Sequence, residues 1–495
     1  MESKPTHPPE CRYAGVMLAL SSLPGRHGIG DMGKAAYAFV DLLAESGVHY
    51  WQLLPINPPG CGNSPYQPYS SFAGDPALID LDDPTLSALL DTSASPFNEN
   101  AICVDYDGVR VYKDYVLRKA FQSFIPHADF TAFAEQPLLK DYAVFMAFRR
   151  KHQEKNWMDW EKPFREWPKH RNLDLSPYEA DIHYELFLQY LFFSQWKRLK
   201  AYANQKGIEM LGDIPFYVGQ DSQDVWAGQA NFLLDDKGQP SFIAGVPPDY
   251  FSPTGQRWGN PIYDWNYMQR DGFTFWLNRM ESCKHLFDMV RIDHFRAFDT
   301  YWKIPVSCPT AEEGEWIEAP GYAFFNQLRE SLPELNIIVE DLGYLRDEVL
   351  MLRDHFHFRG MKILEFSVEP WARIDFSKDK EQLVVYTGTH DNQTAQGWYS
   401  SMPWWKRLGI KNALRRKGYT RGTIAHKMVC LALDHPADMV VIPVQDILGL
   451  GDEARMNTPG TIGSPNWEWK LADLGALQAA MPAFAKSVKE SYRVL

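Results

Sequence analysis

The 495-residue sequence predicts one catalytic α/β unit over 1–495, a TIM-type (β/α)8 barrel with large subdomains inserted after its second and third strands. Three observations predict this class. Short apolar runs rich in β-branched residues recur eight times, helix-like segments separate most of them, and charged residues stand where several runs end. No stretch reaches the roughly eighteen apolar residues that a membrane helix needs. A soluble globular protein without membrane partners is therefore expected.

The expected strands are bounded by turn residues, and most are followed by an amphipathic segment. They cover 15–20, 48–56, 208–218, 289–295, 337–343, 360–366, 384–391 and 439–447. The segment 34–47 is typical of the intervening helices, because its apolar residues recur at i, i+3 and i+4 and its terminal Gly47 suits a C-cap. Strand and helix alternating in this way indicate a closed parallel barrel.

Two intervals are too long to be simple crossovers. Residues 57–207 are expected to form a mainly helical subdomain inserted after strand two, and the pattern over 181–205 supplies the helix before strand three. Residues 219–264 form a smaller insertion after strand three, which we interpret as a lid. Both insertions would project from the barrel rather than form separate catalytic domains.

Composition narrows the partners and the compartment. The net charge is −13 and Lys and Arg form no long run, which disfavours nucleic acid. Six cysteines without a CxxC pair indicate neither a zinc site nor a disulfide framework, so reduced thiols in the cytoplasm are expected. The polar, Pro-rich first ten residues resemble neither a secretory signal nor a transit peptide. Aromatic residues reach 14%, and flat rings can stack on a neutral sugar polymer.

Charged residues at the carboxyl ends of the expected strands are the candidate site, because active sites of such barrels lie at that face. Burying charges there is costly unless they are paired or used. The residues are Asp213 on strand three, Arg291 and Asp293 on strand four, Glu340 and Asp341 on strand five, and His390 and Asp391 on strand seven.

Each of these motifs is ambiguous when it is taken alone. Arg291 and Asp293 stand two apart on a strand and face the same side, so the cation can keep the carboxylate ionised, or the two can form a structural salt bridge. Glu340 follows three apolar residues, which would raise its pKa and suit a proton donor, although a rim ion pair is equally compatible. Asp341 should then face the helix layer. His390-Asp391 is a common dipeptide and weak by itself.

Together the motifs are stronger, because acids from strands four, five and seven converge on one mouth. Sugar transfer with retention needs a nucleophile and an acid/base roughly 5 to 5.5 Å apart, with groups that hold the distorted ring. Two other matches are decoys. The GIGDMG stretch at 28–33 is expected to be a loop before the first helix, and the HxH at 355–357 lies among helix-like residues. We expect neither a metal nor another cofactor.

With these residues in view, the chain resembles the α-amylase clan and, more closely, the 4-α-glucanotransferases, also called amylomaltases or disproportionating enzymes. The matching stretches run from strand one to beyond strand eight. They include YWQLLPINPPGCGNSPYQPYSSFAGDP at 50–76, LGDIPFYVGQDSQDVW at 211–226, GVPPDYFSPTGQRWGNPIYDW at 245–265, VRIDHFRAF at 290–298, YTGTHDNQT at 386–394 and RMNTPGT at 455–461. After Asp213 the chain has Ile-Pro-Phe-Tyr where typical amylases carry Asn-His, which favours the amylomaltases over ordinary amylases.

The resemblance implies that Asp293 is the nucleophile, Glu340 the acid/base and Asp391 the acid that grips the sugar hydroxyls. It implies supporting roles for Arg291, Asp213 and His390. By the same resemblance, Tyr66 lies near the cleaved bond, Asn457 reaches the cleft from the far side, and Tyr250, Phe251 and Trp258 belong to a loop that closes over the glucan. The substrates would be maltooligosaccharides and longer α-glucans; the sequence predicts no oligomeric state.

Three alternatives remain at this point. A retaining α-glucan hydrolase would share the catalytic residues and differ in acceptor control. A metal-dependent barrel enzyme would use Asp213, Glu340 and Asp391 as ligands for a hard ion. A catalytically inactive glucan-binding protein would lack one of the three carboxylates, and the sequence contains all three.

Overall fold

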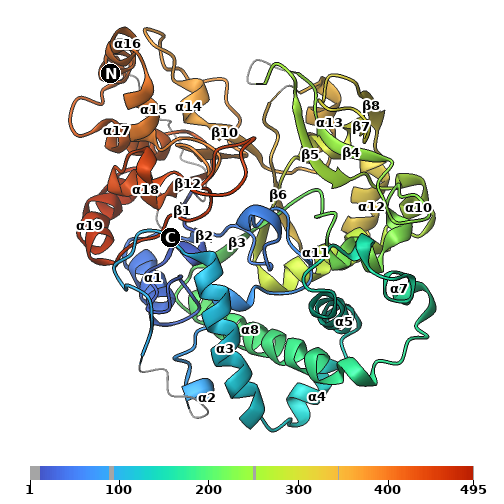
Figure 1. The fold of residues 1–495 in the computed structure, drawn as a ribbon. Coiled ribbons are helices and arrows are strands. Elements are labelled where there is room, and N and C mark those ends of the chain that lie inside the picture. Colours follow the sequence, from blue (N-terminus) through green and yellow to red (C-terminus); the bar gives the residue numbers. More distant parts are fainter. Residues whose placement is uncertain (1–11, 88–93, 249–251, 344, 494–495) are drawn as a thin grey trace.

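The structure is a computed structural model that describes residues 12–87, 94–248, 252–343 and 345–493. Eight parallel strands form the centre: β1 (Tyr13–Met17), β2 (Tyr50–Gln52), β3 (Glu209–Ile214), β6 (Met289–Ile292), β9 (Asn336–Val339), β10 (Gly360–Ile363), β11 (Leu383–Tyr386) and β12 (Met439–Pro443). They are ordered β10-β11-β12-β1-β2-β3-β6-β9. A parallel bridge between Ile338 and Arg359 joins the two outer strands, so the sheet closes into the predicted TIM-type barrel (Figure 1).

Two layers of apolar side chains stabilise the barrel. An inner cluster fills the space between the strands: Met17, Tyr50, Leu211, Met289, Ile338, Met361, Ile363, Val384, Tyr386, Met439 and Val441. A second, larger cluster lies between the outer faces of the strands and the helices. Alternate residues of each strand face opposite sides, so every strand except β10, whose outward side chain is Lys362, contributes to both layers.

Helices follow most of the strands and surround the barrel, but the connections between strands differ in how much helix they contain. They are α1 (Lys34–Glu45), α8 (Glu179–Gln205), α11 (Thr274–Leu286), α12 (Gly321–Ser331), α13 (Asp347–His355), α15 (Ala395–Ser401), α16 (Trp404–Lys417), α17 (Ile424–Leu433), α18 (Val444–Leu448) and α19 (Gly475–Glu490). The connection from β10 to β11 contains only the short α14 (Leu364–Ser367). The loop at 28–33 precedes α1, as predicted.

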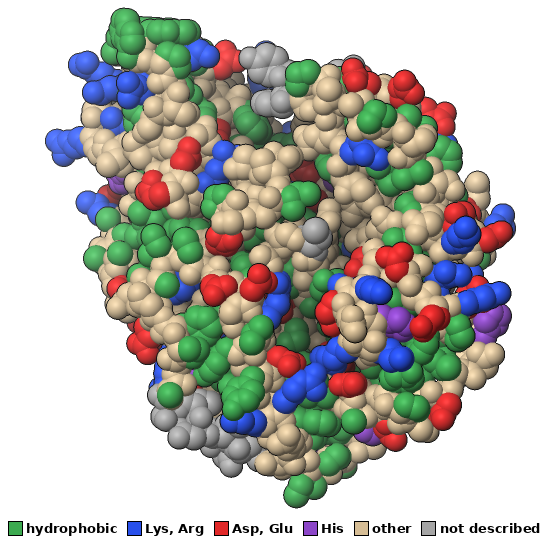
Figure 2. All heavy atoms as spheres, viewed as in Figure 1, with side chains coloured by type: hydrophobic (Ala, Val, Ile, Leu, Met, Phe, Trp, Pro, Cys, Tyr) green, Lys and Arg blue, Asp and Glu red, His purple; other side chains and the backbone are tan. Residues whose placement is uncertain are grey.

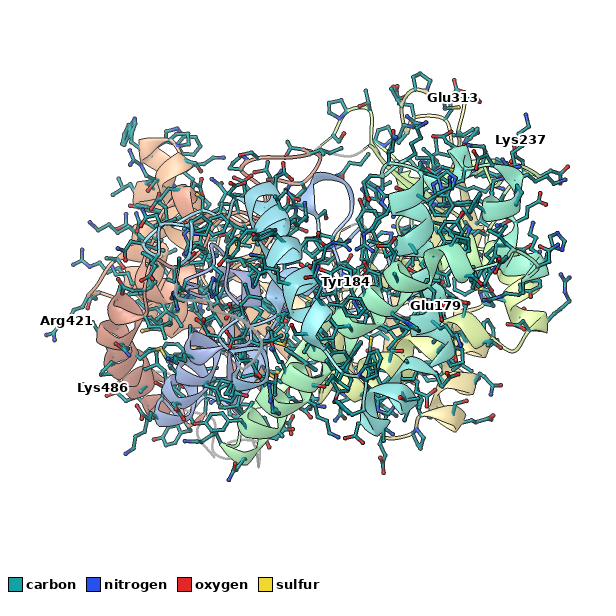
Figure 3. All side chains as sticks on the ribbon, turned by 60° about the horizontal axis from the view of Figure 1, so that its bottom comes forward. Glu179, Tyr184, Lys237, Glu313, Arg421 and Lys486 are labelled. Atoms are coloured by element: carbon teal, nitrogen blue, oxygen red, sulfur yellow. The ribbon has the colours of Figure 1, made fainter. Side chains whose placement is uncertain are left out.

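Residues 57–207 hold a group of helices between β2 and β3. They are α2 (Pro84–Ser87), α3 (Tyr106–Ser123), α4 (Ala128–Ala134), α5 (Pro137–Lys151), α6 (Lys162–Arg165), α7 (Trp167–His170) and α8. Figure 1 shows them below and to the right of the barrel. The labelled Tyr184 of α8 (Figure 3) contacts α3, where its ring lies 5.5 Å from that of Phe121 and 4.2 Å from the guanidinium of Arg118. The long α8 therefore links this group of helices to the barrel strand β3.

A second sheet, with four antiparallel strands, was not predicted. It has the order β5-β4-β7-β8 and contains β4 (Phe242–Val246), β5 (Gln256–Pro261), β7 (Thr300–Pro305) and β8 (Glu315–Glu318). The first two strands lie in the expected insertion 219–264, with α9 (Gln223–Ala227), whereas the other two follow β6, where no insertion was predicted. Because β4 pairs with β7, the excursions after β3 and β6 form one sheet at the upper right of Figure 1.

Several predicted strands extend too far at their carboxyl ends. The run 360–366 is a strand only to Ile363 and then becomes α14, and the run 439–447 changes to α18 after Pro443. A short, mainly apolar run suits a buried strand and a buried helix equally, so periodicity could not locate the change. Among the described residues, no helix combines the length and the apolar character needed to cross a membrane.

Candidate active site

The charged residues singled out from the sequence meet at the carboxyl ends of the barrel strands. Figure 2 shows a hollow on this face, between the lobe that carries α14 to α17 and the lobe that carries the antiparallel sheet. Parallel pairing continues one residue beyond the strands, because the amide of Asp293 donates to Ile214 and that of Glu340 donates to Ile292. The two carboxyl groups therefore leave neighbouring strands at the same level.

Arg291 holds two carboxylates at the bottom of the mouth. Its Nη1 donates to both carboxylate oxygens of Asp213 at 2.7 Å, and its Nη2 donates to Oδ1 of Asp293 at 3.0 Å. The side chains of Arg291 and Asp213 are 4% and 0% exposed, whereas that of Asp293 is 27% exposed. Charge-assisted bonds of this kind orient as well as stabilise, so Asp293 presents a fixed carboxylate to the cleft.

Glu340 lies beside this group and is held by the backbone of the neighbouring strand. Its Oε2 accepts the amide hydrogen of His294 at 2.6 Å. His294 adopts a left-handed conformation with φ 50°, which is uncommon for a residue with a side chain. Strained conformations of this type gather at functional sites, and this one aims a backbone donor at a carboxyl group.

The electrostatic environment separates the two carboxyl groups. Burial, followed by the charge of Asp293, raises the pKa of Glu340 to about 8. Burial also raises the pKa of Asp293, to about 6, but Arg291 opposes that shift. At neutral pH the favoured state is therefore an ionised Asp293 next to a protonated Glu340, and such divergent pKa values identify an acid/base assignment.

Asp341 faces away from the mouth, as the alternation of side chains predicted. It is 7% exposed, accepts the amide hydrogen of Met361 at 2.7 Å, and pairs with Arg353 of α13. Its role is to join β9, β10 and the helix layer. Glu340 and Asp341 are adjacent in sequence but belong to different environments.

Tyr66 and His390 form one wall of the mouth. The Tyr66 hydroxyl donates to Oδ2 of Asp213 at 2.7 Å and lies 3.4 Å from Nδ1 of His390. The two rings stack at 4.8 Å, and Trp467 lies 5.6 Å from Tyr66 and 5.8 Å from His390. Trp467 was not predicted, because it stands far beyond strand eight and no motif marks it.

Asp391 projects into the cleft from the loop after β11. Its side chain is 45% exposed, and Nε2 of His390 lies 3.5 Å from its Oδ2. Asn457, from beyond β12, donates from Nδ2 to the Oδ1 of Asp391 at 2.6 Å. The structure thus brings together Asp391, His390 and Asn457 from two separate segments.

The aromatic residues expected to close the cleft are described in part. The Trp258 ring of β5 meets the His294 ring edge to face at 4.8 Å, and the Trp258 carbonyl accepts from Nε2 of Gln67 at 3.3 Å. Tyr250 and Phe251 lie outside the described residues. His294 was not predicted from the sequence, although its position directly after Asp293 was a usable signal.

The donor set suits organic substrates better than a hard metal ion. Both oxygens of Asp213 already accept hydrogen bonds from Arg291, and one also accepts from Tyr66. In the part of the chain that the structure describes, no group of three or more His, Cys, Asp or Glu side chains is arranged to hold a metal. The alternative that uses Asp213 as a metal ligand therefore does not fit its surroundings.

A (β/α)8 barrel with acidic groups after strands four, five and seven defines the class of carbohydrate-active barrel enzymes. Residues 18–476 match the family model of glycoside hydrolase family 77, described as 4-alpha-glucanotransferase. The chain belongs to this family, as the sequence resemblance indicated.

Relatives cover nearly the whole chain. The 4-alpha-glucanotransferases of Thermus thermophilus and a Synechocystis species are each 42% identical, over 93% of this chain and 95% and 94% of theirs. The solved structure of an amylomaltase from Streptococcus agalactiae, in complex with acarbose, has a TM-score of 0.89 and 34% identity. It covers 98% of this chain and 100% of its own. The match therefore includes both the barrel and its insertions.

Proposed function

We propose that the protein is a 4-α-glucanotransferase that moves a segment of a 1,4-α-D-glucan to the 4-hydroxyl of an acceptor glucan or glucose. The observation that carries the proposal is the pair Asp293 and Glu340, one kept ionised by Arg291 and the other kept protonated by burial. Family membership supplies the substrate class, and the pair supplies the chemistry. Maltooligosaccharides and longer α-glucans are the proposed substrates.

In the first step Glu340 donates its proton to the glycosidic oxygen while Asp293 attacks the anomeric carbon. Arg291 holds Oδ1 of Asp293, so we assign Oδ2 to the attack. The bond from the anomeric carbon to the leaving oxygen breaks, the leaving glucan departs with a free 4-hydroxyl, and an ester joins the donor segment to Asp293. Glu340 is left ionised.

In the second step the ionised Glu340 removes the proton from the 4-hydroxyl of the acceptor. The acceptor oxygen bonds to the anomeric carbon, the ester bond breaks, and Asp293 returns to its carboxylate form. Two inversions at one carbon give retention overall. Both steps use the same two side chains, so no further acid or base is required.

Other residues hold the sugar during these steps. Asp391, exposed to the cleft and oriented by Asn457, is assigned to the hydroxyls of the distorted ring. Tyr66 and His390 stack to form a flat wall beside the cleaved bond. Arg291 and Asp213 act beneath them by orienting Asp293. The supporting observation is that these contacts converge on one opening.

Transfer prevails over hydrolysis only if an acceptor sugar is better placed than water. We assign that selection to the lid in 219–264, where Trp258 approaches His294, with Tyr250 and Phe251. The helices of 57–207 form the proposed inserted subdomain that borders the cleft. We place the enzyme in the cytoplasm, on the composition and the cysteine content of the chain.

The decisive experiment incubates the purified protein with maltotriose and analyses product length. Transferase activity yields both shorter and longer glucans with little free reducing end gained. Products that are only shorter than maltotriose would establish the α-glucan hydrolase instead. Exhaustive chelation should leave the rate unchanged, and loss of activity that a divalent metal restores would favour the metal-dependent alternative.

Two substitutions test the assigned roles. Asp293→Asn and Glu340→Gln should each abolish turnover of maltotriose, because one removes the nucleophile and the other the proton donor. A donor with a fluoride leaving group separates them, since fluoride needs little protonation to depart. Glu340→Gln should therefore still form the maltosyl ester of Asp293 from a maltosyl fluoride, with release of fluoride, whereas Asp293→Asn should not.

A further inference from the structure

We infer that Asp446 and Arg455, both in the chain that follows β12, are positioning residues that orient Asp391 for the transfer reaction. Neither carries the role of a catalytic residue, because both lie behind the loop that presents Asp391. The inference rests on the proposed function, since it concerns the acid assigned there to the sugar hydroxyls.

Asp446 ties together both ends of the loop that carries Asp391. It is 2% exposed. Its Oδ2 accepts the hydroxyl hydrogen of Thr387, which directly follows β11, and its Oδ1 accepts the amide hydrogen of Ala395 at 2.7 Å. Ala395 is the first residue of α15. One buried carboxylate therefore sets the separation between the start and the end of the loop 387–395.

Arg455 ties the middle of the same loop to the segment that carries Asn457. Its Nη2 donates to the backbone carbonyl of Asp391 at 2.8 Å, and its Nε donates to the backbone carbonyl of Asn457 at 2.7 Å. The amide of Asn457 in turn donates to the carbonyl of His390 at 3.1 Å. The guanidinium of Arg455 thus binds the backbone of both Asp391 and Asn457, and this keeps the side chain of Asn457 within hydrogen-bond distance of the Asp391 carboxylate.

The loop is closely packed between these two anchors. Oδ1 of Asn392 accepts both the amide hydrogen and the hydroxyl hydrogen of Thr389, at 2.9 and 2.8 Å. A Cβ at Gly388 would lie 3.2 Å from the side chains of both Asn392 and Glu365. Such a turn moves as a unit when an anchor is lost, and its direction determines where Asp391 points.

The contacts of Asp446 and Arg455 with the loop 387–395 form a frame that holds this loop. The side chain of Asp391 depends on the frame, because it is half exposed and its own contacts come from His390 and Asn457. The nucleophile Asp293 and the acid/base Glu340 directly follow β6 and β9, and the hydrogen bonds of the frame involve neither strand. Loss of an anchor should therefore misplace Asp391, together with the adjacent His390, while Asp293 and Glu340 keep their positions. A misplacement of about 1 Å can cost on the order of 100-fold in rate, so we expect a roughly 10- to 100-fold loss in kcat.

The test compares Asp446→Ala with Asp446→Asn. The asparagine can accept from Ala395 and donate to the Thr387 hydroxyl, so it should restore most of the activity that alanine loses. Asp75→Ala is the matched control, because Asp75 is also buried and accepts one backbone amide hydrogen, from Ala77, in the inserted helices. It should lower stability while kcat stays near that of the unmodified enzyme.

A double-mutant cycle shows whether the effect passes through Asp391. Release of fluoride from a maltosyl fluoride gives measurable rates in slow variants. Asp446→Ala should slow the unmodified enzyme but cause little further loss in an Asp391→Asn background, because residues that act as a unit are not additive. The pH limits of activity should move little, because burial and Arg291 act more strongly than Asp391 on the pKa values of Asp293 and Glu340.

Three results would overturn the inference. They are an unchanged kcat well below the unfolding temperature, an equal loss in the Asp391→Asn background, or a pH profile shifted further than that of Asp391→Asn itself. If Asp446→Ala does not fold, Thr387→Val and Arg455→Met each remove part of the frame, and each is tested by the same double-mutant cycle with Asp391→Asn. Failure of the unmodified enzyme to lengthen maltotriose would refute the proposed function instead.

Discussion

Replacing Arg291 by methionine leaves two carboxylates, Asp213 and Asp293, without the cation that they share. Asp213 is fully buried and would keep an unpaired charge, which costs about 3 to 5 kcal/mol of the free energy of unfolding. A neighbouring cation lowers a carboxyl pKa by about 1 to 3 units, so the pKa of Asp293 should rise above its present value of about 6 by that amount. Its ionised fraction at pH 7 would fall between about 2-fold and 100-fold.

The assay is the initial rate of glucan transfer from maltotriose as a function of pH, with urea unfolding of the same preparations. Activity requires an ionised Asp293, so the acid limit of the Arg291→Met variant should move to higher pH and narrow the active range. Adding Asp213→Asn removes the unpaired charge and should recover stability. It should recover only part of the acid limit, because the charge of Asp213 raises the pKa of Asp293 by less than Arg291 lowers it. Arg149→Met is the control, because it breaks the ion pair between the buried Arg149 of α5 and the partly exposed Asp221 after β3.

An acid limit that does not move in Arg291→Met would refute this reasoning, because it would mean that Arg291 does not set the ionisation of Asp293. Recovery of full activity by the added Asp213→Asn would refute it equally. The control should lose stability and keep its pH limits.

Three further predictions rest on other contacts and on the pKa values of the two catalytic carboxyl groups. The unmodified enzyme should show a bell-shaped dependence of kcat/KM on pH, with loss of activity below about pH 6, where Asp293 becomes protonated, and above about pH 8, where Glu340 becomes ionised. A profile in which kcat/KM falls on one side only would contradict this assignment. Trp258→Ala should raise the share of hydrolysis over transfer, because a gap beside His294 admits water, and an unchanged product ratio would exclude Trp258 from acceptor control. Arg493→Met should lower the free energy of unfolding by about 3 kcal/mol with kcat unchanged, because this buried side chain donates to the carbonyls of Leu433, His435 and Ala437 beneath the barrel. Equilibrium unfolding measures this loss of stability. A loss under about 1 kcal/mol would show that those hydrogen bonds are dispensable.

Much of the site followed from local pattern. In a parallel barrel every strand ends at the same face, so locating Asp293, Glu340 and Asp391 at strand ends was enough to predict that they meet. The inward direction of Glu340 followed from the outward direction of Asp341, because successive side chains of a strand alternate. These inferences needed only spacing along the chain.

The limits of pattern appear where an apolar run changes from strand to helix and where strands pair across long intervals. The helix α14 continues the run that begins as β10, and hydrophobicity does not change at the junction. The pairing of β4 with β7 joins segments on either side of barrel strand β6. Neither feature has a signal within a short window of sequence.

The amino-acid sequence determined the barrel, the family and the three acidic residues, because periodicity and strand alternation act between near neighbours in the chain. The tertiary structure decided how those acids are held. The Tyr66 ring stacks on His390, and Asn457 and Arg455 reach Asp391, across 324, 66 and 64 residues. Contacts between loops at such separations depend on where the whole barrel places each strand end, and no local pattern encodes them.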